Sequence, residues 1–414
     1  MQNYTIKQAL DIPEYTVTFT RIKDQKIHIG LVPYKQSKAT CSHCGKVHHG
    51  KPHSKDTVEV KDLEISGKKV VIHLTKRNYF CPEDGRIHVE SVPWMKPYAR
   101  ATNRYAEHIS RLTAITTNTE AGWFVGLDDE VVYRIDKAHL EEQAALKLTP
   151  IPSGIHLSVD EVSYKKYHNY LTNVIDTDRK LVIWNAKGRK AEILDQYYQG
   201  IGSENCEKIS SVAMDGARTY ISSTAKYAVN ALIVYDKFHL VQKLNHTVDE
   251  VRKQELRKAR SEKDQDLVEL INCKKRFLLL KNKSRLTQCQ TGYLDKLCQL
   301  NEPIYKAMLL KESFLQLYAL GTDDETLVTK HLVDWMAQAY ESGIQAFADL
   351  ADKLFNKIDY ILNWFKQKVS SAISEGFNNK IKRLKRMAYG YRDVDYFRLK
   401  IHQHCGLLNP RLST

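Results

Sequence analysis

The sequence has few prolines beyond its first third. Eight of its ten prolines lie at or before Pro152, and none lies between Pro152 and Pro303. Because proline disrupts helices and central strands, we expect short elements and turns in the first third and long regular elements after it. The segment from Pro150 to Gly154 is the linker that we expect between these two parts.

Long apolar runs and clustered cysteines are also lacking. No apolar stretch approaches the roughly 20 residues of a membrane-spanning helix, and the first residues do not form a signal-peptide core. Only Cys41 and Cys44 lie close together among the eight cysteines, so the sequence does not indicate a disulfide framework. These absences argue against a helical membrane protein and a disulfide-rich secreted domain, and they favour a reducing, cytoplasmic compartment.

An excess of negative charge is absent as well. The 414 residues carry a formal net charge of +14, with 63 Lys and Arg against 49 Asp and Glu. This charge favours a nucleic acid or another anionic surface as partner, although charge alone leaves a basic protein without such a partner open. The length is sufficient for roughly two to four domains.

Residues 1–92 alternate between apolar and polar positions, as in Tyr15–Thr20 and Lys26–Val32, which predicts a small β module. Within this module, Cys41 and Cys44 have the spacing of a zinc knuckle, in which a tight turn presents two thiolates to one ion. The first half of a zinc finger is therefore expected here.

The second half of this zinc pattern is incomplete. It begins at Cys81, but Asp84 stands where a fourth thiolate would be expected. The sequence leaves the fourth ligand open among Asp84, His88, His48, His49 and His53. A finger that binds no metal and is held by packing is the alternative interpretation.

Residues 93–150 have the periodicity of helices. Tyr105, Ile109 and Leu112 form an apolar stripe on the first of them. The opposite face is basic and is expected to carry Arg100, Arg104, His108 and Arg111. This face is a candidate surface for DNA, and a plain three-helix connector is the alternative.

The next two expected helices form a helix-turn-helix. The first covers residues 119–125 and ends at Gly126, and Asp128 is a suitable N-cap for the second, which is expected to reach Leu140. The candidate DNA contacts on the second helix are Tyr133, Arg134 and Lys137. Its surface is otherwise expected to be acidic, which opposes phosphate binding, because it includes Asp128, Asp129, Glu130 and Asp136.

Beyond the linker the pattern changes to that of strands. One alternating run ends at Asp160, and two strands, a helix and a fourth strand that ends at Asp215 follow. A further helix and a strand that ends at Asp236 complete the region 151–250. This order predicts an α/β fold with a ribonuclease-H-like sheet, whose first and fourth strands are neighbours. Asp160 and Asp215 are then expected to meet at one edge of the sheet.

Helical patterns dominate the rest of the chain. Residues 251–360 are expected to form an α-helical insertion in this α/β fold. The sequence does not decide whether the insertion makes dimer contacts or binds DNA. The region 361–414 contains a helix with Glu375 and the basic run Lys380–Arg386. The buried stripe expected on this helix leaves Glu375 on the outward side together with the basic residues.

Three acids in this order, Asp160, Asp215 and Glu375, are what a two-metal phosphodiester site requires. Hard divalent ions such as Mg²⁺ take oxygen ligands, and a pair of ions can hold both the attacking and the leaving oxygen. Each acid alone also has an ordinary interpretation, as a turn or cap residue or as an ion-pair partner. Asp236 and His239 are candidates to orient a ligand of this site, and a helix cap followed by a core histidine is the alternative.

Several strings of residues together amount to a family resemblance. They are Ser158–Glu161, Asn185–Arg189, Met214–Tyr220, Tyr235–Val241, Glu375–Lys382 and Tyr389–Arg392. Through them, and over nearly its whole length, the chain resembles bacterial insertion-sequence transposases of the ISL-three type. These are DDE enzymes with an N-terminal zinc finger and a helix-turn-helix.

The resemblance implies cleavage and strand transfer of DNA at the terminal inverted repeats of an insertion sequence. Asp160, Asp215 and Glu375 would bind two Mg²⁺ or Mn²⁺ ions, and Cys41, Cys44, Cys81 and Asp84 would bind a structural Zn²⁺. The implied partners are double-stranded DNA and further copies of the chain, in a homodimer or a higher synaptic assembly, in the cytoplasm of a bacterium at the nucleoid. The residues expected to contact DNA are Arg100, Arg104, Arg111, Arg134, Lys137, Arg189, Asn379, Lys382, Arg383 and Arg386.

Two other classes of protein share part of this pattern. A non-catalytic, sequence-specific DNA-binding regulator would also have a zinc finger, a helix-turn-helix and a basic surface. A structure-specific ribonuclease-H-like nuclease would share the three acids but would not need an end-binding module at its N-terminus.

Overall fold

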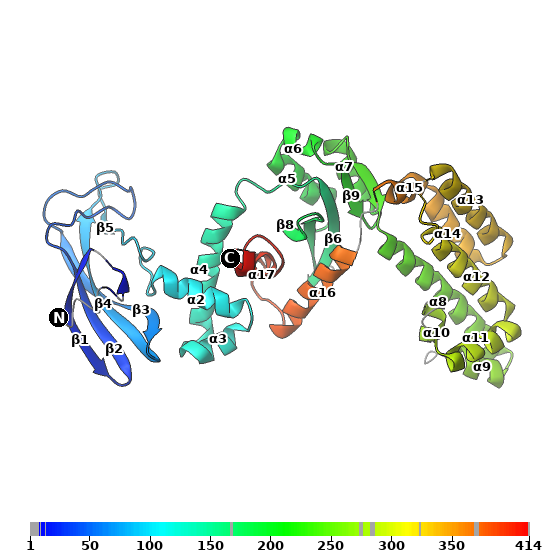
Figure 1. Cartoon of the computed structure of the whole chain (residues 1–414), viewed down its shortest axis with the longest axis horizontal. Coiled ribbons are helices and arrows are strands. Elements are labelled where there is room, and N and C mark those ends of the chain that lie inside the picture. The colour runs from blue at the N-terminus through cyan, green and yellow to red at the C-terminus, as the bar shows by residue number, and fades with distance from the viewer. Residues whose placement is uncertain are drawn as a thin grey trace. The chain divides into compact units, whose positions relative to one another are not determined.

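The computed structural model describes residues 8, 10–12, 14–165, 169–272, 276–281, 286–322, 324–367 and 372–412. The chain divides into two compact units (Figure 1). The first contains Met1–Lys147 together with Asp395–His404 and Leu408–Thr414, and the second contains Leu148–Val394 with Cys405–Leu407. Among the described residues, no helix has both the length and the apolar character that crossing a membrane requires.

The first unit begins with a sheet of five strands in the order β1-β2-β4-β3, with β5 beside β4. Residues from neighbouring strands, such as Ile29, Val60 and Ile72, are fully buried and form the core of this sheet. The predicted β module is therefore present. The strands are β1 (Tyr15–Lys23), β2 (Lys26–Pro33), β3 (Ser54–Ile65), β4 (Lys68–Phe80) and β5 (Ile87–Val89).

Three helices follow the sheet and pack around Ile109 and Val132. A capping box at Thr117 begins the second helix, and Gly126 ends it in the left-handed conformation with a φ of 65°. The short turn after Gly126 leads directly into the third helix, which is the arrangement that the sequence predicted. The helices are α2 (Asn103–Thr113), α3 (Asn118–Val125) and α4 (Asp129–Lys147).

Two predicted helix boundaries are wrong. Arg100 lies before α2 and not on its face, because residues 100–102 pair with β3: Lys61 N donates to Arg100 O at 2.9 Å, and Thr102 N donates to Lys61 O at 3.0 Å. Thr102 then caps the helix. The third helix does not end at Leu140, which is buried, but continues to Lys147.

A C-terminal helix, α17 (Val394–Cys405), completes the core of the helical part of this unit. Asp136 of α4 is fully buried and accepts hydrogen bonds from Tyr396 Oη at 2.6 Å and Lys400 Nζ at 3.2 Å. Lys400 also donates to Thr113 O at 2.8 Å. The expectation that Asp136 adds to an acidic surface is therefore wrong, because its charge is paired inside the unit.

The second unit contains a sheet in the order β10-β9-β6-β7-β8. β6 pairs antiparallel with β7 and parallel with β9, and β9 pairs parallel with β10. The predicted adjacency of the first and fourth strands of this region is confirmed. The strands are β6 (His156–Lys165), β7 (Asn169–Asp176), β8 (Leu181–Lys187), β9 (Ser211–Met214) and β10 (Leu232–Tyr235).

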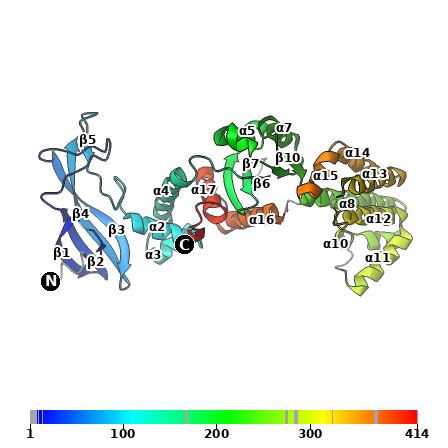
Figure 2. The ribbon, with the colours of Figure 1, turned by 45° about the horizontal axis from the view of Figure 1, so that its top comes forward.

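The two faces of this sheet are covered differently. Leu157 and Val212 point to a face that is covered by α5 (Ala191–Ile201), α6 (Ser203–Glu207) and α7 (Arg218–Tyr227). Ser158 points to the other face, where its hydroxyl lies 2.6 Å from that of Ser374 in α16 (Ala372–Met387). β6 and α16 are neighbours, as Figures 1 and 2 show.

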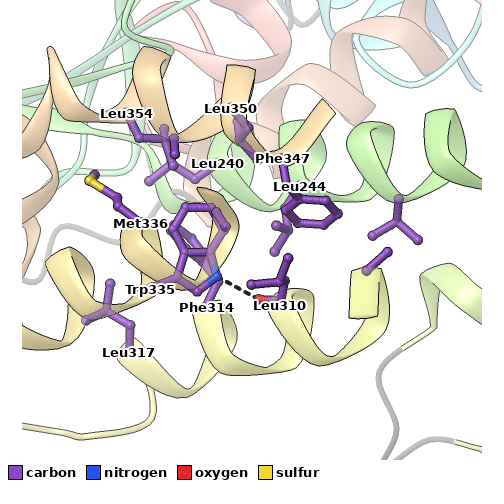
Figure 3. Packing of buried hydrophobic residues seen from close by; sticks show 14 of the residues in the cluster. Leu240, Leu244, Leu310, Phe314, Leu317, Trp335, Met336, Phe347, Leu350 and Leu354 are labelled. Atoms are coloured by element: carbon purple, nitrogen blue, oxygen red, sulfur yellow. Dashed lines mark hydrogen bonds between the residues drawn. The ribbon is translucent and has the colours of Figure 1, made fainter. Parts of the chain in front are cut away.

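The predicted helical insertion is present and begins directly after β10. Its core surrounds the buried Trp335, whose indole N–H donates to Leu310 O at 2.8 Å (Figure 3). It returns to the sheet where Asn363 Nδ2 donates to Ile233 O of β10 at 2.9 Å. The helices are α8 (Lys237–Ser261), α9 (Gln265–Ile271), α10 (Arg276–Leu280), α11 (Gln288–Leu300), α12 (Glu302–Leu317), α13 (Glu325–Glu341), α14 (Gln345–Phe355) and α15 (Ile358–Gln367).

Candidate active site

Asp160 is a buried carboxylate on β6. Its Oδ1 accepts a hydrogen bond from Glu161 N at 2.7 Å, and its Oδ2 accepts one from Asn378 Nδ2 of α16 at 2.5 Å. Strand alternation places Asp160 on the same face as Ser158, which is the face that α16 covers. The carboxylate is thus oriented by the strand on one side and by the helix on the other.

Asp215 follows β9 at a tight turn. Its Oδ1 accepts from Ala217 N at 2.9 Å, and Gly216 between them has a φ of 76°. A Cβ at position 216 would lie 2.7 Å from the ring of Tyr235, so this turn requires glycine for both its conformation and its space. The turn fixes the direction in which the Asp215 carboxylate leaves the strand.

The register between β6 and β9 brings the two aspartates together. The last residues paired between these parallel strands are Ser158 and Ala213. Asp160 and Asp215 each lie two residues beyond this pair, and therefore on the same face of neighbouring strands. Neighbouring strands are roughly 4.8 Å apart, so the two carboxylates lie close together where β9 ends beside the middle of β6.

Glu375 lies on the helix that packs against β6. Ser374, directly before it, contacts Ser158, and Asn378, three residues after it, contacts Asp160. Residues three apart share a helix face, so the half-exposed Glu375 is directed to the same side as Asn378. In the part of the chain that the structure describes, the carboxylate oxygens of Asp160, Asp215 and Glu375 do not all lie within 4.8 Å of one another.

Asp236 and His239 border this site. Asp236 caps α8 by accepting from Phe238 N at 2.8 Å, and His239 Nε2 lies 3.8 Å from both Asp236 Oδ2 and Asp160 Oδ2. Burial alone would lower the pKa of His239, but the nearby negative charges of Asp160 and Asp236 raise it. Asp236 therefore caps a helix, as its alternative interpretation suggested, and this cap lies beside the site.

Glu161 is a neighbour of the site that the sequence did not reveal. Burial raises its pKa, and the charges of Asp215 and Asp160 add to this effect. The charge of Arg189 lowers the pKa of Glu161. Nη1 of Arg189 lies 3.9 Å from Glu161 Oε1, and its guanidinium lies 4.6 Å from the centre of the Tyr170 ring. A DNA contact of Arg189 stays a prediction.

Asn378 is the second residue that the sequence did not assign to the site. Its position three residues after Glu375 was the available signal, because residues at this spacing share a helix face. On the same helix, Ile381 and Leu384 are buried. The predicted DNA contacts on it are all exposed, namely Asn379, Lys382, Arg383 and Arg386.

The predicted DNA contacts in the first unit have different surroundings. Arg104 is bound to the buried Asp62, with Nε to Oδ1 at 2.7 Å, and to Leu10 O at 2.7 Å, so it ties α2 to the sheet. Arg111 pairs with Glu107 at 2.6 Å on the surface of α2. Arg100 and Arg134 are exposed, whereas Lys137 is half-buried with its Nζ 3.9 Å from Glu141 Oε1.

The three cysteines of the predicted finger are together, since the sulfur atoms of Cys41, Cys44 and Cys81 lie within 4.8 Å of one another. A second group of ligand atoms within the same limit consists of His43, Asp84 and His88. His88 Nε2 lies 2.8 Å from Asp84 Oδ2, and this hydrogen bond lowers the pKa of Asp84 to about 2. Three thiolates with a carboxylate and imidazoles nearby suit Zn²⁺.

Comparison with known proteins gives matches over both regions. Residues 157–401 match the family model of a transposase, and residues 37–84 match that of the zinc-finger of transposase IS204/IS1001/IS1096/IS1165. The transposase for insertion sequence element IS1001 of Bordetella parapertussis is 31% identical over 87% of both chains. The transposase for insertion sequence element IS1557 of Mycobacterium tuberculosis is 24% identical over 85% of this chain and 82% of its own.

Proposed function

Because the chain belongs to the ISL-three family of transposases, we propose that it binds the terminal inverted repeats of an insertion sequence and catalyses metal-dependent cleavage and strand transfer of that DNA. The observation that carries this proposal is the placement of Asp160 and Asp215 on neighbouring strands, beside which α16 holds Asn378 and Glu375. The strands have the order β10-β9-β6-β7-β8, and β6 runs antiparallel to β7 but parallel to β9. This arrangement supports a ribonuclease-H-like core.

Asp160, Asp215 and Glu375 are the proposed metal ligands. Within the part of the chain that the structure describes, none of the three forms an ion pair with a Lys or Arg side chain, so their negative charge is available to cations. All their donor atoms are carboxylate oxygens, which suits hard divalent ions such as Mg²⁺ or Mn²⁺. Two such ions, when bound, would activate the attacking oxygen and stabilise the leaving oxygen.

The protein's own groups position these ligands. Asn378 directs Oδ2 of Asp160, and the turn at Gly216 directs Asp215. His239 lies beside Asp160 and contributes positive charge at the edge of the site when it is protonated. Water first, and then a 3′-hydroxyl of the element's DNA, would attack in line with the leaving oxygen, and no covalent protein intermediate is required.

The first unit is the proposed end-binding module. We propose that Cys41, Cys44, Cys81 and Asp84 bind a structural Zn²⁺, with His88 orienting Asp84. The helix-turn-helix of α3 and α4 would contact double-stranded DNA, helped by the exposed arginines. A homodimer or a higher assembly would hold two ends together.

The proposed division of the chain follows these roles. A zinc-finger β module and a helix-turn-helix domain form the first part, and a catalytic domain interrupted by a helical insertion forms the rest. The proposed regions are 1–92, 93–150, 151–236, 237–360 and 361–414, in which the insertion starts with α8 at Lys237 rather than at residue 251 as the sequence suggested.

The experiment that tests the proposal uses the repeats that flank this reading frame. The purified chain is incubated with Mg²⁺ and a duplex that carries one repeat with its flanking DNA. Cleavage at the repeat followed by joined products supports a transposase, and the variants Asp160→Asn and Asp215→Asn should bind the duplex without cleaving it. Cleavage without preference for the repeat indicates the nuclease, and binding without cleavage by the unaltered chain indicates the regulator.

A further inference from the structure

A cluster of cations lies beside Asp215, and all but one of them belong to the helical insertion. A groove of about 1060 Å³ in the second unit is lined by residues of α7, α8 and α14. Four basic side chains line it, and we term them the groove cations: Arg218, Lys243, Lys353 and Lys357. Arg218 begins α7, Lys243 and Lys353 belong to α8 and α14, and Lys357 follows α14.

Two of the groove cations are fixed at the end of the sheet where Asp215 lies. Lys357 Nζ donates to Gly216 O at 2.6 Å, directly beside Asp215. Lys243 Nζ donates to the hydroxyl of Tyr235, and both ammonium groups lie over the Tyr235 ring, at 4.9 Å for Lys243 and 5.3 Å for Lys357. The insertion therefore places positive charge next to a proposed metal ligand.

These charges lack carboxylate partners. Among the described side chains, none of the groove cations forms an ion pair with Asp or Glu. The two acids that line the groove have other partners: Glu250 lies 3.1 Å from His246, and Asp349 accepts from Gln345 at 2.7 Å. Burial lowers the pKa of Lys243, and the neighbouring Lys357 and Lys353 lower it further, although Asp215 opposes them. An anion in the groove would relieve this repulsion.

Packing holds the groove in shape. Leu240 and Leu244 of α8 pack in one core with Leu350 and Leu354 of α14, as Figure 3 shows. These helices carry Lys243 and Lys353, so the spacing of the charges is set by a buried apolar core rather than by flexible loops. A site that is organised before binding loses less entropy when a ligand is held.

We propose that the groove cations bind backbone phosphates of the DNA strand next to the phosphodiester that is cleaved, which makes the insertion part of the DNA-binding surface of the active site. This inference rests on the proposed function. A strand that enters the site at Asp215 brings further phosphates at intervals of roughly 3.4 Å along the duplex axis, and they need cations beside the site. The insertion is then a phosphate clamp, a role that the sequence alone left open.

The test uses the two groove cations that have no bond to the sheet. Arg218 and Lys353 are exposed, so the double variant Arg218→Gln/Lys353→Gln should fold normally. We measure the affinity of the full chain for the repeat duplex at several salt concentrations without added Mg²⁺ or chelator, which prevents cleavage and leaves bound Zn²⁺ in place. Each lost phosphate contact should reduce the slope of log K against log salt by about 0.9, hence by about 2 for the double variant.

Two further variants control this measurement. Lys306→Gln removes a half-exposed lysine of α12 that pairs with Glu302 at 2.8 Å in the same insertion, and it should leave the slope unchanged. The charge-conserving variant Arg218→Lys/Lys353→Arg should keep most of the slope. A slope in the double glutamine variant equal to that of the unaltered chain overturns the inference, as does an equal loss with Lys306→Gln.

The outcomes separate this inference from the proposed function. If the unaltered chain cleaves the repeat duplex and the double glutamine variant keeps the full salt slope, only the phosphate clamp is wrong. If the unaltered chain binds DNA but never cleaves it, the proposed function fails, and a reduced slope in the double variant still supports phosphate binding in the groove. A methyl phosphonate near the cleavage point gives a second readout. Because it removes the charge of the bound phosphate, it should lower the affinity of the unaltered chain for the duplex more than that of the double variant.

Discussion

Asn378 Nδ2 donates a hydrogen bond of 2.5 Å to Asp160 Oδ2, across 218 residues of sequence. The bond joins the helix that carries Glu375 to the strand that carries Asp160. Two proposed metal ligands that are far apart in the chain are therefore positioned by one amide group. The orientation of the Asp160 carboxylate depends on how α16 lies against the sheet.

The first prediction concerns this amide. The variant Asn378→Ala should reduce metal-dependent cleavage by roughly 10- to 100-fold, because Asp160 loses the partner that orients it. The Mg²⁺ concentration for half-maximal activity should rise, while the affinity for the repeat duplex without added Mg²⁺ stays the same. Asn379→Ala is the matched control, since Asn379 is exposed on the same helix and should leave the Mg²⁺ requirement unchanged. Equal Mg²⁺ curves for Asn378→Ala and the unaltered chain would contradict the prediction.

The second prediction concerns the turn at Gly216. Gly216→Ala places a Cβ 2.7 Å from the Tyr235 ring at a φ of 76°, so the turn must move and Asp215 with it. We expect strong loss of cleavage and a loss of unfolding free energy of about 1–3 kcal/mol. Gly343→Ala is the control, because Gly343 has a similar φ of 73° but no atom within 4 Å of the added Cβ. Thermal unfolding and cleavage rates measured together should show that only the substitution at Gly216 affects activity.

The third prediction concerns the buried pair of Asp136 and Lys400. Lys400→Met should destabilise the first unit by roughly 3–5 kcal/mol, because it leaves the Asp136 carboxylate buried with no charged partner. The double variant Asp136→Leu/Lys400→Met should recover much of this stability, since neither charge is then buried alone. Chemical denaturation monitored by circular dichroism tests both variants. A single variant as stable as the unaltered chain would contradict the presence of a buried charged pair.

The fourth prediction concerns zinc. A strong chelator should remove one equivalent of Zn²⁺, expose the segment 37–90 to proteolysis and weaken binding to the repeat duplex. Cys81→Ser should have the same effect, whereas Cys289→Ser should not, because Cys289 is exposed and lies outside the cysteine group. Asp84→Asn should weaken zinc binding more than His88→Ala if Asp84 is the ligand and His88 only orients it. The reverse order would assign the fourth position to His88.

The sequence predicted features that local pattern determines. Asp160 and Asp215 end alternating or apolar runs, and the order of strands and helices was sufficient to infer that their strands are neighbours. The helix-turn-helix was predictable from Gly126, because its left-handed conformation ends α3. The cysteine group followed from the spacing of Cys41 and Cys44 and the later Cys81.

Contacts between distant segments were not predictable in the same way. Asp136 has the sequence surroundings of a surface acid, because its partner Lys400 lies 264 residues later. Arg104 looked like a phosphate contact, whereas its side chain is bound to Asp62 on a strand. The residues around the site, such as Asn378, become apparent only when α16 is placed on β6. In each case the missing information was a pairing that no local periodicity encodes.

The helix α17 has a consequence for the order in which the molecule folds. Tyr396 and Lys400, the partners of Asp136, lie 260 and 264 residues after it in the chain. The nascent chain therefore cannot complete the interior around α4 until α17 has been synthesised. A product whose translation stops before α17 would leave the Asp136 carboxylate without these partners, and its proposed end-binding module would be unfinished.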